Sequence, residues 1–536
     1  MKPDPASTAY REICAKWRGE TDAPRRLPAD RRAYWTLGIF LCVVSGLRLW
    51  YLHQGYLELS PDEVHYWEWS RRLDWSYYSK GPFVAYLIAL STAIGGATEL
   101  FVRLPAVVLS AGTTICVFGL VRDLFHDVRL ALATAMLLHV IPLFAAGALL
   151  MTIDPPLVFF WSLMLWLVYR AVSESRPVHW YAAGIALACG LLSKYAMGFL
   201  PVSLLLFLAT SERYRGWLRR KEPYLMLVIG VLGFSPVILW NLRHGAVSLR
   251  HVMGQAEVQQ GIPLHLSLET FGEFLGSQAL VLSPLLFGWM FVVMVSSLRE
   301  GLRRHDDRWL YLFWGWAPTF GLMLLLSLRQ KVQANWAAPA YITALMATVA
   351  YVAWRWKAGH TRRWGRIHLA GAGLALLIGL GMTVALHDPT LFIRLGFPPD
   401  ADPLGRLKGW RALARAVGTL AAEMPRPPFL LSDRYQISSE LAFYVAGQPY
   451  TYNVNLGRRL NQYDLWDGLP ALAGQDAIYV QPDSAELPQA LRASFRTCDT
   501  GQAVIIEERG RELKRFYLFQ CLGFSGKPPR PVEVRY

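Results

Sequence analysis

A succession of long apolar segments is the feature that most constrains this chain. Eleven such segments, most of them close to 20 residues long, follow one another between residues 33 and 386. A helix needs about 20 mainly apolar residues to cross a bilayer, and within hydrocarbon it satisfies its own backbone hydrogen bonds. We therefore predict an α-helical polytopic membrane protein. The expected spans lie near residues 33–53, 100–121, 129–149, 156–172, 179–193, 196–211, 223–241, 276–298, 309–328, 336–354 and 367–386.

Composition supports the membrane class. Hydrophobic residues make up 54% of the 536 residues and charged residues 17%, whereas soluble domains average about 45–50% and about 25%. The net charge of +15 would suit nucleic-acid binding only if the basic residues gathered on one soluble surface. They are instead scattered between the apolar segments, so we expect no nucleic-acid partner.

The basic residues predict the orientation of the spans. Lys and Arg in short loops mark the cytoplasmic side of a membrane, and Arg25, Arg26, Arg31 and Arg32 precede the first span. Residues 1–32 are therefore expected to be cytoplasmic. Eleven alternating crossings then place five further basic loops on the same side, at residues 122–128, 173–178, 212–222, 299–308 and 355–366.

One apolar segment would disturb this alternation. Residues 82–95 (PFVAYLIALSTAIG) are apolar but number only 14, where a span needs about 20. We expect them to form a short helix on or in the outer surface, inside an outer loop at residues 54–99. The predicted membrane domain is thus residues 33–386.

Residues 387–536 differ in composition from the rest. They are polar and Pro-rich and contain no spanning segment, which predicts a soluble extracytoplasmic domain. Runs rich in strand-forming residues at 477–480, 503–506 and 516–519, with a helical pattern at 407–424, favour a small α/β domain. Cys498 and Cys521 are the two cysteines on this side. An oxidising compartment permits a disulfide between them, and two buried free thiols remain the alternative.

Unusual polar residues gather on the predicted outer side of the membrane. Two acids, Asp62 and Glu63, stand in the first outer loop, and Asp154 lies at the mouth of the fourth span. Single cations at span ends are commonly anchors, a span-mouth acid is commonly a helix N-cap, and loop acids are commonly solvated. Convergence of the whole set on one membrane face favours a functional site. Its cations are Lys80, Lys194, Arg329 and Lys331.

This set suits group transfer from a lipid phosphate in the membrane. Cations hold the donor phosphate and stabilise the charge that grows as it leaves, and a carboxylate serves as base for a hydroxyl acceptor. Glu63, Tyr66, Trp67 and Tyr78 are candidates for contacts with a sugar or acceptor, although aromatic residues at this level more often form an interface belt.

At these residues the sequence resembles the GT-C membrane glycosyltransferases, in the branch of the lipid A aminoarabinose transferases and protein O-mannosyltransferases. The acidic motif of the family matches Asp62-Glu63, its second acid matches Asp154, and its lysines match Lys80 and Lys194. The resemblance implies a polyisoprenyl-phosphate sugar donor, Asp62 as catalytic base and Asp154 as a second catalytic residue. The aminoarabinose transferases carry an acid directly before the loop lysine, where this chain has Ser79. The prediction therefore does not include aminoarabinose as the transferred sugar.

We therefore predict an inverting glycosyltransferase in a bacterial inner membrane, with its C-terminal domain in the periplasm. The acceptor would be lipid A, the lipopolysaccharide core, another glycolipid or a protein. A polytopic transporter and a non-catalytic envelope assembly subunit are the alternatives. No cofactor is indicated with certainty. A divalent metal at His244, His251 and His265 with Glu257 or Glu269 is an open alternative, but surface histidines are favoured there.

Overall fold

The computed structural model describes residues 28–255, 266–357, 362–398, 401–466, 468–482 and 484–529. Most of the predicted cytoplasmic segment 1–32 lies outside these residues. The chain divides into two compact units. The first contains residues 1–50, 104–238 and 261–387, and the second contains residues 51–103, 239–260 and 388–536.

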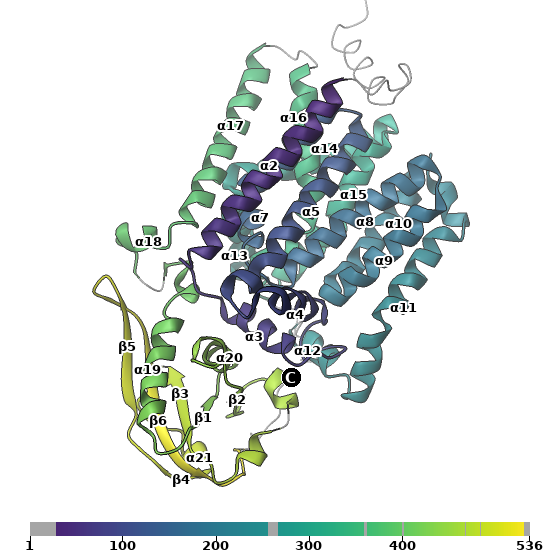
Figure 1. Ribbon diagram of the computed structural model, residues 1–536. Helices are drawn as coiled ribbons and strands as arrows, with labels where there is room; N and C mark the ends of the chain where they lie inside the picture. The colour runs from purple at the N-terminus through teal and green to yellow at the C-terminus, as the bar shows by residue number, and fades with distance from the viewer. Residues whose placement is uncertain are drawn as a thin grey trace, which may run out of the picture. The chain divides into compact units, whose positions relative to one another are not determined.

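Helices make up the first unit, and its long helices run side by side in Figure 1. Within the described residues, six helices of the chain are long and apolar enough to cross a membrane: α2 (Pro28–His53, counted from Arg31), α5 (Glu99–Phe125), α8 (Asp154–Glu174), α11 (Glu222–Arg243), α14 (Pro284–Arg304) and α15 (Asp307–Ser327). The remaining predicted spans are also helical. They correspond to α6 (Val128–Leu137) with α7 (Pro142–Gly147), α9 (Pro177–Ser193), α10 (Phe199–Thr210), α16 (Ala340–Lys357) and α17 (Arg362–Ala385).

Two of the predicted spans are not single helices. The span expected at 129–149 breaks at Ile141, whose backbone is extended in front of Pro142. The span expected at 276–298 breaks at Ser283, whose φ is +84° in front of Pro284, and the residues before it form α13 (Leu268–Leu282). Proline disfavours the helical conformation of the residue before it. Apolar length alone therefore misplaced these two boundaries.

The core of the first unit is formed by apolar faces of neighbouring helices. The fully buried Trp161 and Leu165 of α8 lie in this core, and α8 packs against α9. Helix α15 packs against α16 at Gly315, where an added Cβ would come within 2.6 Å of the Thr343 side chain. The absence of a side chain at Gly315 is what permits this close approach.

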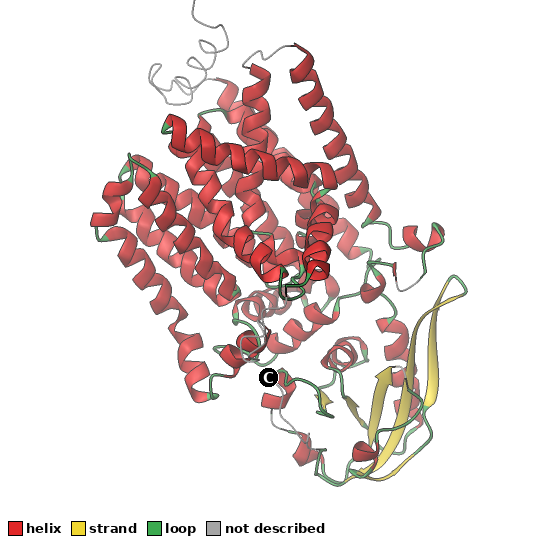
Figure 2. Cartoon of the chain, turned by 180° about the vertical axis from the view of Figure 1, so that it is seen from behind, coloured by secondary structure: helices red, strands yellow, loops and turns green. Residues whose placement is uncertain are grey.

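A six-stranded sheet organises the C-terminal part of the second unit, where Figure 2 shows the strands. The strand order is β2-β1-β3-β6-β4, and β5 also pairs with β6. Strand β1 is parallel to β2 and β3, whereas β6 is antiparallel to β3, β4 and β5. The mixed sheet with its helices confirms the predicted small α/β fold. Its strands are β1 (Phe429–Ser432), β2 (Thr451–Asn453), β3 (Ala477–Pro482), β4 (Phe495–Cys498), β5 (Gln502–Glu508) and β6 (Arg511–Phe524).

Helices pack on both faces of this sheet. Leu413 and Val417 of α19 (Trp410–Glu423) and Leu441 of α20 (Tyr435–Tyr444) share one core with inward residues of β1, β3 and β6. Leu491 of α21 (Gln489–Arg492) belongs to the core of the opposite face. The helix predicted at 407–424 and the three predicted β-runs are therefore present, whereas β1, β2, β4 and α20 went unpredicted.

Cys498 and Cys521 form a disulfide. They stand directly opposite one another in the antiparallel pairing of β4 with β6, a position where two side chains on the same sheet face meet. The disulfide therefore ties β4 to a strand that itself pairs with β3.

The second unit also contains parts of the chain that the sequence assigned to the membrane domain. These parts form α3 (Pro61–Ser70), α4 (Phe83–Gly95) and α12 (Val247–Gln255). Helix α3 packs against α20, and the Glu58 carboxylate accepts a hydrogen bond of 2.5 Å from the backbone N–H of Trp410. These contacts join residues about 350 positions apart, so composition along the chain does not reveal them. The short segment 82–95 is a helix, α4, as predicted.

Candidate active site

The first unit brings Asp154 and Lys194 together. Asp154 begins α8, followed by Pro155 and Pro156 in the first turn. Lys194 follows α9 with an extended backbone, and its Nζ lies 2.7 Å from Asp154 Oδ1. Asn335, in a short 3-10 turn, donates from Nδ2 to Asp154 Oδ2 at 2.6 Å. Both carboxylate oxygens are thereby occupied, and the Asp154 and Lys194 side chains are only 16% and 13% exposed.

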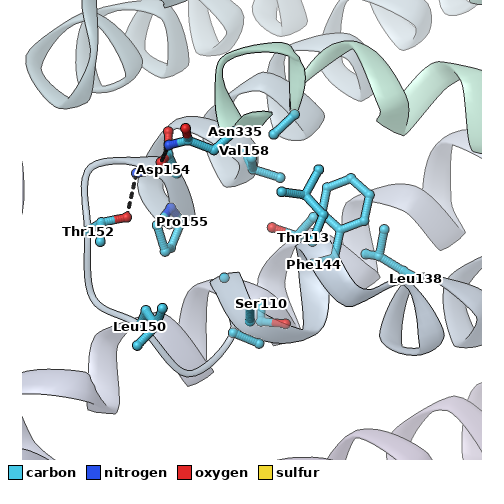
Figure 3. A pocket seen from close by; sticks show the side chains of 15 residues that line it. Ser110, Thr113, Leu138, Phe144, Leu150, Thr152, Asp154, Pro155, Val158 and Asn335 are labelled. Carbon is cyan, nitrogen blue, oxygen red and sulfur yellow. Dashed lines mark hydrogen bonds between the residues drawn. The ribbon is translucent and has the colours of Figure 1, made fainter. Parts of the chain in front are cut away.

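A cavity of about 280 Å³ adjoins this cluster. Figure 3 shows Asp154, Thr152 and Asn335 on one side of it, with Leu138 on another. Most of the lining is apolar, including Phe144 and Val158. Such a cavity accepts an apolar chain. Its polar side consists of the Asp154 carboxylate, the Asn335 amide and hydroxyl groups, and Lys194 lies outside the lining but is bonded to Asp154.

Arg329 and Lys331 occupy a different environment. Both side chains are exposed, and Lys331 Nζ forms an ion pair of 3.1 Å with Glu273, which is itself 45% exposed. The lining of the cavity includes neither residue. The structure thus groups Lys194 with Asp154 and does not add Arg329 or Lys331 to that cluster.

In the second unit, Asp62 and Glu63 of the acidic motif lie in the first turn of α3. Their side chains have different environments. Glu63 is fully buried, and Arg103 grips it with two hydrogen bonds of 2.8 Å, from Nε and from Nη2. Glu63 also closes a capping box with Ser60. These interactions occupy both oxygens of Glu63, so its burial does not support the predicted contact with a sugar or acceptor, which stays a prediction.

Asp62 points to a more open environment. Its side chain is 42% exposed, and its Oδ2 lies 3.9 Å from Arg406 Nη2. Tyr435 donates a hydrogen bond of 3.1 Å to Asp62 Oδ1. Burial of the phenol, followed by the charge of Asp62, raises the pKa of Tyr435, which keeps the phenol a donor at neutral pH. Asp62 is therefore oriented by Tyr435 and remains accessible.

The predicted aromatic contacts lie in the interior. Tyr66, Trp67 and Tyr78 are 8%, 2% and 2% exposed, and Trp67 packs edge-on against Phe443 of α20. These three aromatic residues of the predicted outer loop therefore pack inside the second unit, and their low exposure does not support the expected contacts with a sugar.

Lys80 lies in the loop before α4, where its carbonyl accepts a hydrogen bond from the backbone N–H of Tyr77. Its side chain is half-buried. Burial, assisted by the charge of Lys80, lowers the pKa of His251 to about 4, so His251 is neutral at physiological pH. Lys80 thus places positive charge close to α12.

Four residues of this geometry were not singled out in the sequence: Arg103, Asn335, Arg406 and Tyr435. Arg103 carried a usable signal, because a cation inside a predicted apolar span demands a partner. Asn335 lies in the same polar stretch as Arg329 and Lys331 but was not selected there. Arg406 and Tyr435 carried no signal, since their partner Asp62 stands far away in the chain. Among the described residues, no three His, Cys, Asp or Glu side chains gather closely enough to hold a metal ion. Glu257 and His265 lie outside those residues.

Comparison with known proteins places this geometry in context. Residues 79–240 match the family model of dolichyl-phosphate-mannose-protein mannosyltransferases. The lipid A galacturonosyltransferase RgtD of Rhizobium johnstonii is 27% identical over 426 residues, which are 76% of this chain and 83% of that protein. The undecaprenyl phosphate-α-4-amino-4-deoxy-L-arabinose arabinosyl transferase of Pseudomonas paraeruginosa is 29% identical over 213 residues, which span only 36% of each chain.

Solved structures agree on the fold. ArnT of Cupriavidus metallidurans bound to undecaprenyl phosphate superposes with a TM-score of 0.60 at 16% identity, covering 90% of this chain and 97% of ArnT. Its apo state gives a TM-score of 0.57 at 17% identity, with 91% and 98% covered. The resemblance stated from the acidic motif and the lysines is confirmed. The chain is a multi-pass membrane glycosyltransferase of the GT-C fold.

Proposed function

We propose that this enzyme transfers a sugar from a polyisoprenyl-phosphate carrier to a lipid acceptor, with inversion at the anomeric carbon. The observation that carries the proposal is the cavity of about 280 Å³ with Asp154 and Asn335 on its polar side. A polyisoprenyl phosphate has a long apolar tail and an anionic head, and this cavity offers an apolar lining with a lysine bonded to its polar side.

Lys194 is the proposed contact of the carrier phosphate. Its ammonium is held 2.7 Å from Asp154, and Asp154 is in turn held by Asn335, so the cation is positioned before the donor arrives. Preorganised charge of this kind stabilises the negative charge that develops on a departing phosphate. Lys80, Arg329 and Lys331 remain proposed as further phosphate contacts.

Asp62 is the proposed base. The acceptor hydroxyl gives its proton to Asp62 while its oxygen bonds to the anomeric carbon. The bond from that carbon to the phosphate oxygen breaks, and the carrier phosphate leaves with the electron pair. Asp154, whose two oxygens already accept hydrogen bonds, positions Lys194 and the substrates. The partial exposure of Asp62 supports its role as the base. The hydrogen bonds that both carboxylate oxygens of Asp154 already accept support its role in positioning.

The proposed acceptor is lipid A or a related glycolipid, because the name of the relative RgtD specifies lipid A. We further propose that the reaction takes place at the outer face of a bacterial inner membrane, with the C-terminal domain in the periplasm. The basic loops between spans support this orientation.

Orientation is tested by cysteine labelling in intact cells with an impermeant thiol reagent. Arg219→Cys, in the basic loop 212–222, should be protected, whereas Arg459→Cys, an exposed position in the C-terminal domain, should react. Native cysteines are controlled by labelling the unsubstituted protein in parallel. Reaction at Arg219→Cys with protection at Arg459→Cys would reverse the proposed orientation.

Donor binding is tested with Lys194→Gln. Loss of one charge-assisted contact to a desolvated phosphate costs about 2–3 kcal/mol, so the Kd for undecaprenyl phosphate should rise about 30- to 150-fold. Equilibrium binding to the protein in nanodiscs measures it. Lys221→Gln, an exposed lysine of the 212–222 loop, is the matched control and should bind as wild type. Unchanged affinity in Lys194→Gln would contradict the proposed donor site. The same measurement on Lys331→Gln reports whether Lys331 contributes to binding of undecaprenyl phosphate.

A further inference from the structure

An arginine of the first unit is buried inside a membrane-spanning helix without an acidic partner. Arg48 lies near the end of α2 and is 8% exposed, whereas Leu47 and Trp50 beside it are 60% and 56% exposed. Arg48 therefore lies on the face of α2 that packs against the rest of the unit. Among the residues that the structure describes, no carboxylate forms an ion pair with it. An ionised group buried at membrane depth is costly and usually functional.

Arg48 reaches the cavity beside Asp154 through a serine of α5. Its Nη1 donates a hydrogen bond of 3.1 Å to Ser110 Oγ, and Ser110 lines that cavity. Figure 3 shows Ser110 on the opposite side of the cavity from Asp154. Because the hydroxyl oxygen of Ser110 accepts from Arg48, its hydrogen is left for an acceptor inside the cavity. Thr114 does not compete for it, since Thr114 donates to the backbone carbonyl of Ser110.

The cavity lacks any other anion for Arg48. Asp154 is the one ionisable side chain of its lining, and both oxygens of Asp154 already accept hydrogen bonds, from Lys194 and Asn335. Lys194 balances the charge of Asp154, whereas within the described part of the chain nothing balances Arg48. Its charge acts strongly across an apolar cavity, because the low dielectric screens it little. An anionic group that enters the cavity therefore gains from Arg48.

We propose that Ser110 and Arg48 form a second contact for the phosphate of the polyisoprenyl carrier. The Ser110 hydroxyl donates to an oxygen of the phosphate, and Arg48 is a positioning residue that orients this hydroxyl and supplies the balancing charge. The inference rests on the proposed function and adds two residues to its donor site, on the wall opposite Asp154. The same charge stabilises the phosphate as it leaves the sugar.

The test compares binding of undecaprenyl phosphate with binding of undecaprenol, which lacks the phosphate, to the full-length protein in nanodiscs. Arg48→Gln should raise the Kd for undecaprenyl phosphate about 10- to 100-fold, and Ser110→Ala about tenfold, as expected for hydrogen bonds that involve a charged group. The two losses should be less than additive in the double variant, because Arg48 acts through Ser110. The Kd for undecaprenol should stay unchanged in each variant, whereas a merely structural defect would weaken both ligands.

Arg355→Gln is the matched control. Arg355 of α16 also donates to a hydroxyl, that of Tyr351 at 2.9 Å, but it lies outside the cavity lining, so this variant should bind as wild type. Arg48→Lys keeps the positive charge and should retain most of the affinity. Ser110→Ala removes only one oxygen atom and keeps the test decisive where Arg48→Gln does not fold.

Unchanged affinity for undecaprenyl phosphate in Arg48→Gln and Ser110→Ala, or equal weakening of both ligands, would overturn the proposal. Competition by phosphatidic acid as strong as by undecaprenyl phosphate would assign the contact to a bilayer phospholipid and overturn the carrier assignment. Lys194→Gln, measured in parallel, separates this inference from the proposed function. Weaker binding in Lys194→Gln alone refutes the Ser110–Arg48 contact and leaves the proposed donor site standing, whereas weaker binding in Arg48→Gln alone refutes the role proposed for Lys194.

Discussion

Asp62→Asn should lower turnover by about 10²- to 10⁴-fold, the usual cost of removing a general base, while donor affinity stays unchanged. The reason is that an amide cannot take the acceptor proton, although it still accepts the hydrogen bond from Tyr435. Asp154→Asn should lose less turnover, because its proposed role is to position Lys194. Turnover of purified protein with a lipid-linked sugar donor, measured together with binding of undecaprenyl phosphate, separates the two variants.

Glu507→Gln supplies the control for this experiment, because Glu507 is an exposed acid of β5 in the same unit, and it should match wild type. Activity of Asp62→Asn within about threefold of wild type, far below the expected factor, would rule out Asp62 as the base. That result is also expected if the acceptor oxygen belongs to an already ionised phosphate, since such an acceptor needs no base.

Arg103→Met should destabilise the second unit by about 3–5 kcal/mol, the cost of breaking a buried ion pair from one side. The Arg103 and Glu63 side chains are 3% and 0% exposed, and Arg103 also donates to the carbonyls of Leu57 and Glu58 at 2.9 and 2.8 Å. The substitution leaves the Glu63 carboxylate buried without its cation. The decrease in the free energy of unfolding is measured by denaturant titration in a fixed detergent, with the fluorescence of the second unit as the signal.

Two further variants isolate the cause. Arg515→Met breaks an ion pair in which both side chains are 43% exposed and should leave the stability nearly unchanged, because solvent screens exposed ion pairs. The double variant Glu63→Gln with Arg103→Met should recover much of the lost stability, because no uncompensated charge stays buried. A double variant as unstable as Arg103→Met alone would show that the contacts of Arg103 with the two carbonyls are the important ones.

The acidic motif illustrates how far a local pattern reaches. Its position after the first apolar segment was enough to indicate Asp62 as a functional residue. That position does not reveal that Asp62 is partly exposed whereas Glu63 is buried. That distinction arises because Arg103, 40 positions further on, buries Glu63, while Tyr435, 373 positions further on, orients Asp62. Two adjacent acids on one helix thus differ in environment because their partners are distant in the sequence.

Lys194 and Asp154 illustrate the opposite case. Each stands at the end of an apolar helix, where the cost of an ionised group near hydrocarbon makes it noticeable in the sequence. Their pairing was not predicted, because the lysine was expected to face the donor phosphate directly. The structure places the acid between Lys194 and Asn335, so the lysine enters the site already paired.

The sequence by itself determined the membrane class, the helical character of the spans, the small α/β domain and the acids and lysines worth testing. Each of these depends on hydropathy, charge or strand propensity within a short window, so each is readable locally. Only the tertiary structure decided which segments share a unit, where the spans break and which charges are buried in pairs. The packing of α3 on α20 is an example of the first. Those outcomes depend on contacts between residues tens to hundreds of positions apart, and a side chain's burial and partner are set by the folded neighbours rather than by its neighbours in sequence.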